Sequence, residues 1–390
     1  MKRNYPVGIQ NFEKIRNGNY CYIDKTDLIY QLIKSGQYYF LSRPRRFGKS
    51  LLISTLEAYF QGKKELFEGL AIEQLEKEWI EYPILHLDLN AQKYDTPESL
   101  YSILNNALCI WESLYGSRPS ETNLSLRFQG VIQRTAEKWN RPVVILIDEY
   151  DKPMLQAIGN EPLLNDYRNT LKAFYGVMKS CDKYIQFALL TGVTKFSKVS
   201  VFSDLNNLMD ISIDNRFANI CGITEKELLS NFKEDIVELG QKNGMTEEET
   251  KAYLKDMYDG YHFVEYGDDI YNPFSLLNTF AKMKFGSYWF ETGTPTFLVE
   301  LLKHSEYDLH RLTEEMTSAD SLGGIDTMYS NPIPILYQSG YLTIKGYDKE
   351  FQVYYLGFPN KEVEEGFTKF LLPCYAHLQT GNKRHREMDC

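Results

Sequence analysis

The segment Ser42-Arg-Pro-Arg-Arg-Phe-Gly-Lys-Ser50 constrains this chain most, because it ends in Gly-Lys-Ser and joins two different kinds of element. The preceding run, 38–41, is aromatic and aliphatic like a buried strand, and the following segment, 51–60, has the apolar periodicity of a helix. A turn between a strand and a helix presents backbone N–H groups at the helix N-terminus, where the helix dipole favours negative charge. The sequence therefore predicts a phosphate-binding P-loop.

Each residue of this loop has an expected role. Lys49 is expected to reach the β- and γ-phosphates of a nucleotide, and the Ser50 hydroxyl to hold Mg²⁺. The other residues expected to surround the phosphates are Arg45, Arg46, Phe47, Gly48 and Leu51. The full pattern GxxxxGK[ST] requires glycine where this chain has Arg43. Gly-Lys-Ser also occurs in ordinary surface turns, and it is the strand-to-helix context that favours the P-loop here.

A second motif follows at the end of another apolar run, Pro142-Val-Val-Ile-Leu-Ile-Asp148-Glu149. A continuous apolar run predicts a strand buried on both faces of a parallel sheet, and acids at its carboxyl end lie where ligands bind. Asp148 is expected to hold Mg²⁺ through water, and Glu149 to polarise the attacking water. Alternatively, the two acids only end a strand at the surface, which the upstream Gly-Lys-Ser makes the minority interpretation.

Strand and helix patterns alternate over the first half of the chain. Strands separated by helices predict an α/β fold with a parallel sheet, helices on both faces and right-handed crossovers. A glutamate beside the expected metal-binding aspartate suits the branch of P-loop ATPases that inserts a strand between the strands that carry the two motifs. The run 83–89 is expected to supply the intervening strand. The predicted strands are 37–42, 83–89, 142–147 and 184–191, and the predicted helices are 27–35, 51–60, 97–115, 124–139 and 162–179.

Several polar residues are candidates for sensing or stabilising the transferred phosphate. Thr191 ends the fourth predicted strand and Thr194 follows it, where a sensor residue would lie, and Lys195 is a further candidate. The alternative is that Thr191-Gly192 forms a turn and nothing more. Arg216 and Arg168 are candidates for stabilising transition-state charge, although most arginines only solvate a surface.

The β/α pattern stops at about residue 223. Thr224 and Glu227 have the spacing of a capping box, and 246–258 reads as another acidic helix. We expect four regions: a P-loop core over 1–222, a helical lid over 223–285, a C-terminal α+β region of winged-helix type over 286–380, and a disordered tail over 381–390. In the third region a strand pair is expected around Gly346, followed by a helix over 362–372. His262 is interpreted as a packed residue rather than a catalytic one.

Composition limits the classes of protein to which this chain can belong. The 390 residues are 43% hydrophobic and 25% charged, as in a globular protein. No run of about 18 apolar residues and no signal-peptide core is present, which predicts a cytoplasmic protein without membrane contact. The six cysteines form no CxxC pair, so we expect reduced thiols rather than zinc or disulfides. A net charge of −10 argues against a protein that binds nucleic acid over its whole surface. A local basic patch of Arg43, Arg45, Arg46 and Lys49 leaves nucleic-acid contact open, but a phosphate ligand explains these residues better.

Several motifs together resemble the AAA-ATPase-like family of bacterial proteins. They cover nearly the whole chain: Val7-Gly-Ile-Gln-Asn-Phe, Tyr22-Ile-Asp-Lys-Thr, the P-loop segment, Leu146-Ile-Asp-Glu-Tyr-Asp-Lys-Pro, Leu190-Thr-Gly-Val-Thr-Lys-Phe, Tyr258-Asp-Gly-Tyr-His-Phe, Tyr271-Asn-Pro-Phe-Ser and Tyr341-Leu-Thr-Ile-Lys-Gly-Tyr. The resemblance implies an AAA+-type core related to archaeal-type and STAND ATPases, in which arginine at position 43 is typical. Many relatives continue into a PD-(D/E)XK nuclease-like domain. No Asp followed by a spaced (Asp/Glu)-x-Lys is found after residue 360, so nuclease activity is not expected of these residues.

Two functions remain open from the sequence. The first is a Mg²⁺-dependent ATPase that couples ATP binding and hydrolysis to conformational change, with Glu149 and Thr191 in the catalytic machinery and Arg216 as the candidate finger. The second is a nucleotide-gated switch with negligible turnover that controls a protein partner or a nuclease-like effector. A homo-oligomer is compatible with both functions, and DNA as a partner is undecided. A DNA-associated motor is disfavoured by the acidic composition.

Overall fold

The computed structural model describes residues 4–196, 207–292, 296–304, 316–322 and 331–371. It separates into two compact units, each described here by itself. Unit 1 comprises Met1–Arg43 and Gly48–Cys221, and unit 2 comprises Pro44–Phe47 and Gly222–Cys390. The expected tail over 381–390 lies outside the described residues, and the subdivision of the second half near residue 285 stays a prediction.

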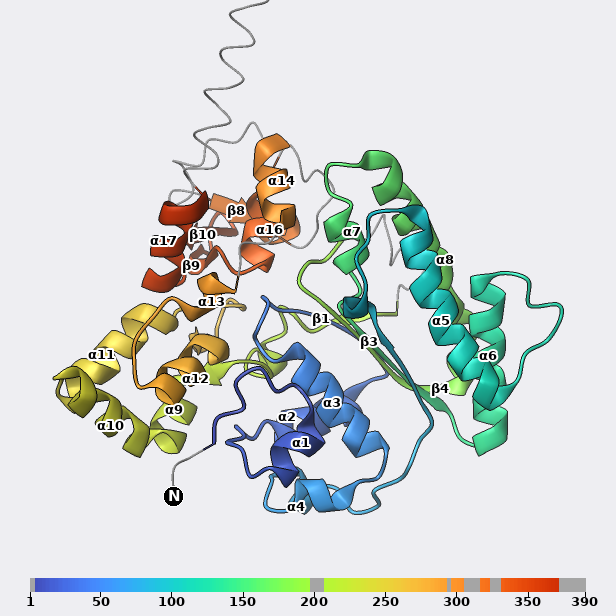
Figure 1. Cartoon of the computed structure of the whole chain (residues 1–390), viewed down its shortest axis with the longest axis horizontal. Helices are drawn as coiled ribbons and strands as arrows, with labels where there is room; N and C mark the ends of the chain where they lie inside the picture. Colours follow the sequence, from blue (N-terminus) through green and yellow to red (C-terminus); the bar gives the residue numbers. More distant parts are fainter. Residues whose placement is uncertain (1–3, 197–206, 293–295, 305–315, 323–330, 372–390) are drawn as a thin grey trace, which may run out of the picture. The chain divides into compact units, whose positions relative to one another are not determined.

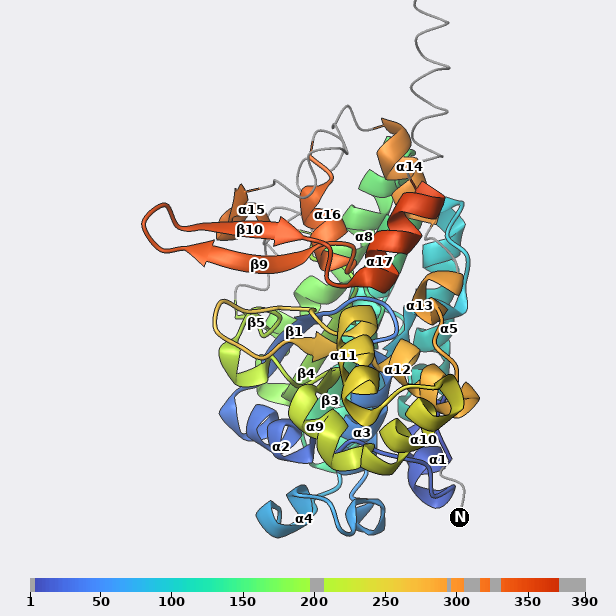
Figure 2. The ribbon, with the colours of Figure 1, turned by 90° about the vertical axis from the view of Figure 1, so that its left-hand side faces the viewer.

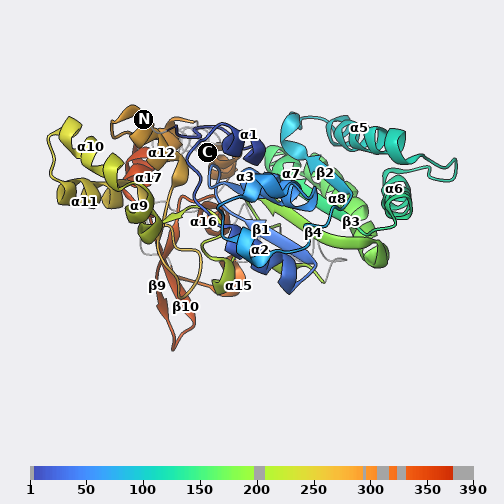
Figure 3. The ribbon, with the colours of Figure 1, turned by 90° about the horizontal axis from the view of Figure 1, so that it is seen from below.

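Unit 1 is built on a parallel sheet, in the strand order β2-β3-β4-β1-β5 (Figures 1 and 3). Every neighbouring pair is parallel, so the predicted α/β fold is confirmed. All residues of β3 are buried, which is why this strand reads as an uninterrupted apolar run. The strands are β1 (Tyr38–Ser42), β2 (Ile84–Asp88), β3 (Val143–Asp148), β4 (Ile185–Gly192) and β5 (Met209–Asp210).

A strand is inserted between the two motif-bearing strands, as expected, but it is a different one. β4 pairs with β1 on one side and with β3 on the other. β2, which comes between the two motifs in sequence and was expected to be the intervening strand, pairs with the far edge of β3. Strand order in space is set by the crossovers and not by order along the chain, so sequence spacing alone misplaced the insertion.

Helices surround this sheet. α3 packs against β3 and β4, whereas α5, α6 and α8 pack against one another (Figure 3). Phe128 of α6 stacks on Phe174 of α8 with ring centroids 4.3 Å apart, and this aromatic contact anchors the helix pair. The helices are α1 (Phe12–Asn17), α2 (Thr26–Ser35), α3 (Lys49–Phe60), α4 (Ile72–Leu75), α5 (Pro97–Tyr115), α6 (Leu124–Trp139), α7 (Lys152–Gln156) and α8 (Glu161–Ser180), with short 3-10 turns at Lys64–Phe67, Leu89–Ala91, Asp182–Tyr184 and Asn215–Phe217.

Unit 2 contains mostly short helices and two small sheets. β6 (Ile223–Thr224) pairs antiparallel with β7 (Ile270–Tyr271), and a second antiparallel sheet has the order β8-β10-β9. The strands of the second sheet are β8 (Met316–Ser318), β9 (Thr343–Asp348) and β10 (Val353–Gly357). The helices are α9 (Glu225–Asn231), α10 (Lys233–Asn243), α11 (Glu247–Tyr258), α12 (Pro273–Lys282), α13 (Tyr288–Glu291), α14 (Thr296–His304), α15 (Ala319–Leu322), α16 (Ile333–Gln338) and α17 (Lys361–Gly366), and a π-turn covers Phe367–Leu371.

The strand pair near residue 346 turns at a different place from the one expected. β9 and β10 form a long hairpin (Figure 2). Gly346 lies inside β9 opposite Tyr355, and the chain turns at 349–352 instead. The register shifts between Tyr355 and Leu356, directly after the Gly346 pair, so this glycine accompanies a strand irregularity rather than a turn.

The capping box predicted at the start of α9 is present. The Thr224 hydroxyl accepts from Glu227 N at 3.2 Å, and Glu227 Oε2 accepts from Thr224 N at 2.8 Å. These two bonds satisfy N–H groups that a helix N-terminus otherwise leaves without partners. They therefore fix where unit 2 passes from β6 into α9.

Replacing Thr224 by Ala should lower the free energy of unfolding of unit 2 by about 1 kcal/mol, because the substitution removes the capping acceptor. Urea unfolding followed by circular dichroism measures the change. Ser230→Ala on the exposed side of the same helix is the matched control and should leave stability near the wild-type value. Equal stability of T224A and wild type would contradict the structural role of the capping box.

Candidate functional site

The carboxyl ends of β1, β3 and β4 bring the predicted motif residues of unit 1 together. Lys49 begins α3 after the loop that follows β1, Asp148 ends β3, and Thr191 lies near the end of β4. Carboxyl ends of parallel strands share one edge of the sheet, which is where open α/β folds bind ligands. The inserted strand β4 therefore contributes to the same edge as the two motif strands.

Lys49 joins the two motifs directly. Its side chain is buried, and its ammonium lies 3.3 Å from Glu149 Oε1. The same ammonium donates to the Arg43 carbonyl oxygen at 3.1 Å. The long cation expected to contact phosphate and the acid expected to polarise water are thus an ion pair in this structure.

Asp148 is held by a threonine on the neighbouring strand. The Thr191 hydroxyl donates to Asp148 Oδ1 at 2.5 Å, and both residues are buried. A hydroxyl that donates to a carboxylate orients that carboxylate. Of the two candidate threonines, Thr191 is therefore the one that the structure connects to the predicted metal-binding acid.

Glu149 has an unusual backbone conformation for its residue type. Its φ is 55°, in the left-handed region that non-glycine residues seldom occupy. Adjacent backbone bonds hold this turn: Tyr150 N donates to the Thr191 carbonyl at 2.9 Å, and Lys152 N donates to the Glu149 carbonyl at 3.0 Å. Such conformations cluster at functional sites because the surrounding structure must maintain them. The outlier is consistent with a carboxylate positioned for chemistry rather than one that simply ends a strand.

A third carboxylate, Asp151, lies next to Asp148 and Glu149 and was not singled out from the sequence. It is fully buried, and it accepts from Val193 N at 3.1 Å, from Thr194 N at 2.6 Å and from the Thr194 hydroxyl at 2.7 Å. Thr194 is therefore bound to Asp151 and not to Asp148. The available signal was position, since Asp151 comes two residues after Glu149 in the same acidic motif.

The pKa of Asp151 is raised to about 7, first by burial and then by the nearby charge of Glu149. Hydrogen bonds from Thr194 and the charge of Lys49 act in the opposite direction. The carboxyl of Asp151 therefore responds electrostatically to both members of the Lys49–Glu149 pair. A change in the Lys49–Glu149 ion pair would therefore change the pKa of Asp151.

Gly192 allows the Asp151 turn to approach β4. A Cβ atom at this position would lie 2.6 Å from Asp151 Oδ1 and 2.7 Å from the ring of Tyr150. The Thr191-Gly192 pair is the end of a strand rather than a turn, so the alternative interpretation of these residues is wrong. The close contact explains the glycine without any turn.

Arg43, which replaces the glycine of the P-loop pattern, is a buried structural residue. Only 1% of it is exposed. Its guanidinium donates to the carbonyl oxygens of Ser42 and Ser212 at 2.9 and 2.8 Å, and to that of Ala218 at 3.3 Å. These bonds tie the end of β1 to the 212–218 segment. The arginine thus performs a backbone-organising role where a glycine would leave three carbonyl acceptors without this donor.

The middle of the predicted P-loop makes its contacts within unit 2. The Arg45 carbonyl accepts from Trp289 Nε1 at 3.0 Å, and the Arg46 guanidinium lies 5.0 Å from the centroid of the Phe274 ring. The Phe47 ring packs edge-on against Tyr261, with centroids 4.7 Å apart. The expected contribution of Arg45, Arg46 and Phe47 to phosphate binding stays a prediction.

The remaining candidates make contacts of their own. Arg216 is paired with Asp214 at 2.6 Å, and Lys195 with Asp210 at 2.5 Å. Arg168 donates to Asn165 Oδ1 at 2.8 Å on the exposed surface of α8. The structure thus brings together Lys49, Asp148, Glu149 and Thr191. Arg216, Lys195 and Arg168 instead bind acids or an amide elsewhere in unit 1.

Two wider features concern metals and membranes. Within the described ranges, no group of three or more His, Cys, Asp or Glu side chains is arranged to hold a metal ion, and Cys21, Cys109, Cys181 and Cys221 are free thiols. No described helix combines the length and apolar character that a membrane span requires.

Comparison with known proteins gives two matches. The family model described as Predicted AAA-ATPase matches residues 6–202, which include every strand of the unit 1 sheet up to β4. A relative from Azotobacter chroococcum mcd 1, described as an uncharacterized protein in the vnfD 5′ region, is 37% identical over 389 residues. The match covers 97% of this chain and 73% of the relative.

Restoring the pattern glycine at position 43 should destabilise the protein rather than improve it. Arg43→Gly removes the donor for the carbonyl groups of Ser42, Ser212 and Ala218, and we expect the free energy of unfolding to fall by at least about 2 kcal/mol. Arg43→Met keeps most of the side-chain volume but not the donors, so it should lose a comparable amount. Urea unfolding of both variants measures this, and wild-type stability of R43M would show that packing alone, not hydrogen bonding, is needed.

Proposed function

The chain belongs to the predicted AAA-ATPase family, and from this premise we propose that unit 1 binds ATP with Mg²⁺ and hydrolyses it. The observation that carries the proposal is the 3.3 Å approach of the Lys49 ammonium to Glu149 Oε1. Lys49, with the proposed role of binding phosphate, and Glu149, with the proposed role of activating water, are far apart in sequence. They meet at one edge of a parallel sheet. A surface turn and an unrelated strand end have no reason to meet there.

The residues at this edge fit a Mg²⁺–nucleotide by their chemistry. The hydroxyl of Ser50 and the carboxylate of Asp148 are hard oxygen donors of the kind that Mg²⁺ prefers. Gly48 has φ of 99°, and apart from its two chain neighbours no described residue has an atom within 4 Å of the position where its Cβ would be. Its backbone thus has the open surroundings that phosphate oxygens need. The bound Mg²⁺ would neutralise charge developing on the transferred phosphate.

In this proposal the cation of Lys49 changes partner during the cycle. Phosphate oxygens compete with the Glu149 carboxylate for the ammonium, because both are anions within its reach. When Lys49 turns to phosphate, Glu149 is released from the ion pair and becomes available to accept a proton from water. The exchange is the local conformational change through which binding would be coupled to hydrolysis.

Thr191 and Asp151 have supporting roles. The Thr191 hydroxyl donates to Asp148 Oδ1 and so fixes the orientation of the carboxylate. The other oxygen, Oδ2, is then held in one direction. Asp151 anchors the 193–194 backbone and thereby maintains the turn that carries Glu149. Both are positioning residues rather than groups that touch the reacting atoms.

The alternative function is a nucleotide-gated switch with negligible turnover, and one observation favours it. Glu149 is paired with Lys49 in this structure, so its Oε1 is engaged by the ammonium rather than by a water molecule. If the pair persists when nucleotide is bound, binding occurs without efficient hydrolysis. Measured turnover in the presence of Mg²⁺ decides between the two functions.

The first test removes the phosphate-binding cation. Lys49→Ala should weaken ATP–Mg²⁺ binding at least tenfold, or about 1.4 kcal/mol, because the only motif-positioned ammonium is lost. Isothermal titration calorimetry measures the affinity. Lys64→Ala, at an exposed position of unit 1, removes the same charge elsewhere and should bind like wild type. Equal affinity of K49A and wild type would refute the P-loop assignment.

The second test separates binding from chemistry. Glu149→Gln keeps the shape and a hydrogen bond but removes the proton acceptor, so ATP turnover should fall about 10²- to 10⁴-fold. Binding should persist, since the amide no longer competes with phosphate for Lys49. Phosphate release and calorimetry measure the two effects, with Glu161→Gln on the exposed start of α8 as the control. Unchanged turnover in E149Q would show that Glu149 is not the base.

A further inference from the structure

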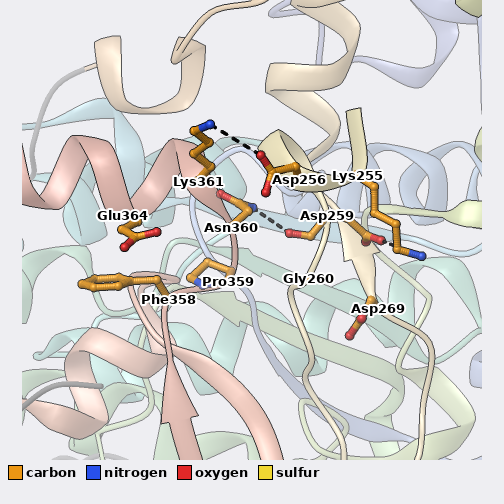
Figure 4. Close-up of a pocket in the computed structure, with 10 residues that line it drawn as sticks. All are labelled: Lys255, Asp256, Asp259, Gly260, Asp269, Phe358, Pro359, Asn360, Lys361 and Glu364. Atoms are coloured by element: carbon orange, nitrogen blue, oxygen red, sulfur yellow. Dashed lines mark hydrogen bonds and ion pairs between the residues drawn. The ribbon is translucent and has the colours of Figure 1, made fainter. Parts of the chain in front are cut away.

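Unit 2 contains a pocket that the nucleotide proposal does not use. Its volume is about 470 Å³, within the range of small-ligand sites. Two segments line it: the end of α11 with the chain that follows, and the segment from Phe358 that leads into α17 (Figure 4). The first segment includes Asp259-Gly-Tyr-His, a motif that has no part in the proposed nucleotide site.

Asp259 is the feature of this pocket that most requires an explanation. The residue is 3% exposed, and among the described residues its Oδ1 has no hydrogen-bond partner. Its Oδ2 is 4.0 Å from Lys255 Nζ, which is too long for a hydrogen bond. A buried carboxylate oxygen without a donor costs free energy that proteins seldom leave uncompensated. A ligand that donates to Oδ1 would remove that cost.

The carboxyl of Asp259 is nevertheless ionised at the pH of most binding assays. Burial raises its pKa to about 6, and the charge of Asp269 acts in the same direction. The backbone N–H of Gly260 and the charge of Lys255 oppose this rise. Above pH 7 the pocket therefore presents a buried negative charge.

The lysines of the pocket compensate only part of the charge of its acids. Lys255 lies 3.1 Å from Glu225, and Lys361 lies 3.7 Å from Asp256. The lining carries four carboxylates, from Asp256, Asp259, Asp269 and Glu364, against these two lysines, which leaves a net charge of −2. The electrostatic potential of the pocket therefore favours a cation.

The walls of the pocket are fixed by close backbone contacts. Asn360 Nδ2 donates to the Asp259 carbonyl at 2.7 Å (Figure 4). A Cβ atom at Gly260 would lie 2.2 Å from the Pro359 carbonyl oxygen, so only glycine allows the two lining segments to approach this closely. Gly260 also has φ of 87°, in the region that favours glycine. Asp259 is thus held in place before any ligand arrives.

A metal ion is not the cation that this arrangement suits. Across the described parts of the chain, no cluster of three or more acids, histidines or cysteines is close enough to share a metal. The carboxylates around the pocket are spread out, so they suit a cation whose donors point in several directions. A planar guanidinium has five such donors, and its stem and face can pack against an aromatic ring such as Phe358.

We propose that the pocket beside Asp259 binds a guanidinium group, with Asp259 Oδ1 as its principal acceptor. The group would come either from an arginine side chain of a polypeptide or from a free guanidine compound. This proposal does not rest on nucleotide binding by unit 1. Its failure and the failure of the proposed ATPase activity are therefore distinguishable.

The test titrates the full-length protein with two probes at pH 7.5 and low salt, using isothermal titration calorimetry. N-acetyl-L-arginine methylamide represents an arginine residue within a chain, and agmatine represents a free guanidine. The neutral isostere N-acetyl-L-citrulline methylamide is the ligand control and should bind at least tenfold more weakly. Saturable binding of agmatine alone would identify a free compound as the ligand class, and binding of the arginine derivative would identify a polypeptide side chain.

Asp259→Asn should lower the affinity for whichever probe binds by at least tenfold, because the substitution removes the buried charge but keeps the shape of the side chain. Glu248→Gln, an 84% exposed acid outside the pocket, is the matched control and should bind like wild type. If D259N does not fold, Glu364→Gln replaces it and should weaken binding at least threefold. ATP affinity should be the same in all these variants. No saturable binding of either probe, or equal affinity for the citrulline derivative, would overturn the proposal.

Discussion

The insertion of β4 between β1 and β3 is the constraint on which the candidate site depends. Parallel pairing on both edges of β4 places Thr191 beside Asp148, where its hydroxyl donates to the carboxylate. The same register leads the chain through Gly192, the residue whose missing side chain lets the Asp151 turn approach. Without β4 in this position, β1 and β3, which precede Lys49 and Glu149 in the chain, would be adjacent strands with no threonine between them. Backbone pairing thus determines which side chains form the site, and side-chain chemistry determines what the site can do.

Arg43 shows how a motif can depart from its pattern and still position the functional residues. In the usual pattern a glycine keeps the loop compact, whereas here a buried guanidinium binds the carbonyl groups of the 212–218 segment. The Arg43 carbonyl in turn accepts from the Lys49 ammonium. One residue therefore connects the end of β1, the segment after β5 and the Lys49 ammonium. This is consistent with a loop whose shape is maintained by hydrogen bonds rather than by the conformational freedom of glycine.

The sequence predicted the periodic parts of the molecule well, because buried parallel strands leave a continuous apolar run and helices leave a repeating one. It placed β3 and the start of α3 within a residue or two, and it found the capping box at Thr224. It misjudged features that depend on contacts between distant residues. The spatial position of β2, the role of Gly346 inside β9 and the network around Asp151 follow from pairing and burial, which no local pattern records. Asp148 and Thr191 were each selected from the sequence, but only the fold shows that they touch.

The buried acids of this protein differ in how their charge is accommodated, and the difference indicates which of them needs a ligand. Asp151 receives several donors from the 193–194 segment, so it is satisfied by the protein itself. Glu362 Oε1 accepts from the Ser275 hydroxyl and the Trp289 N–H. Burial raises the pKa of Glu362 to about 7, so protonation near neutral pH removes its buried charge. Asp259 has a lower pKa, borders a pocket, and keeps an oxygen without a donor among the described residues. The backbone N–H of Gly260 and the charge of Lys255 stabilise the ionised carboxylate, but its Oδ1 has no hydrogen-bond partner among the described residues. The proposed guanidinium would supply the missing donor.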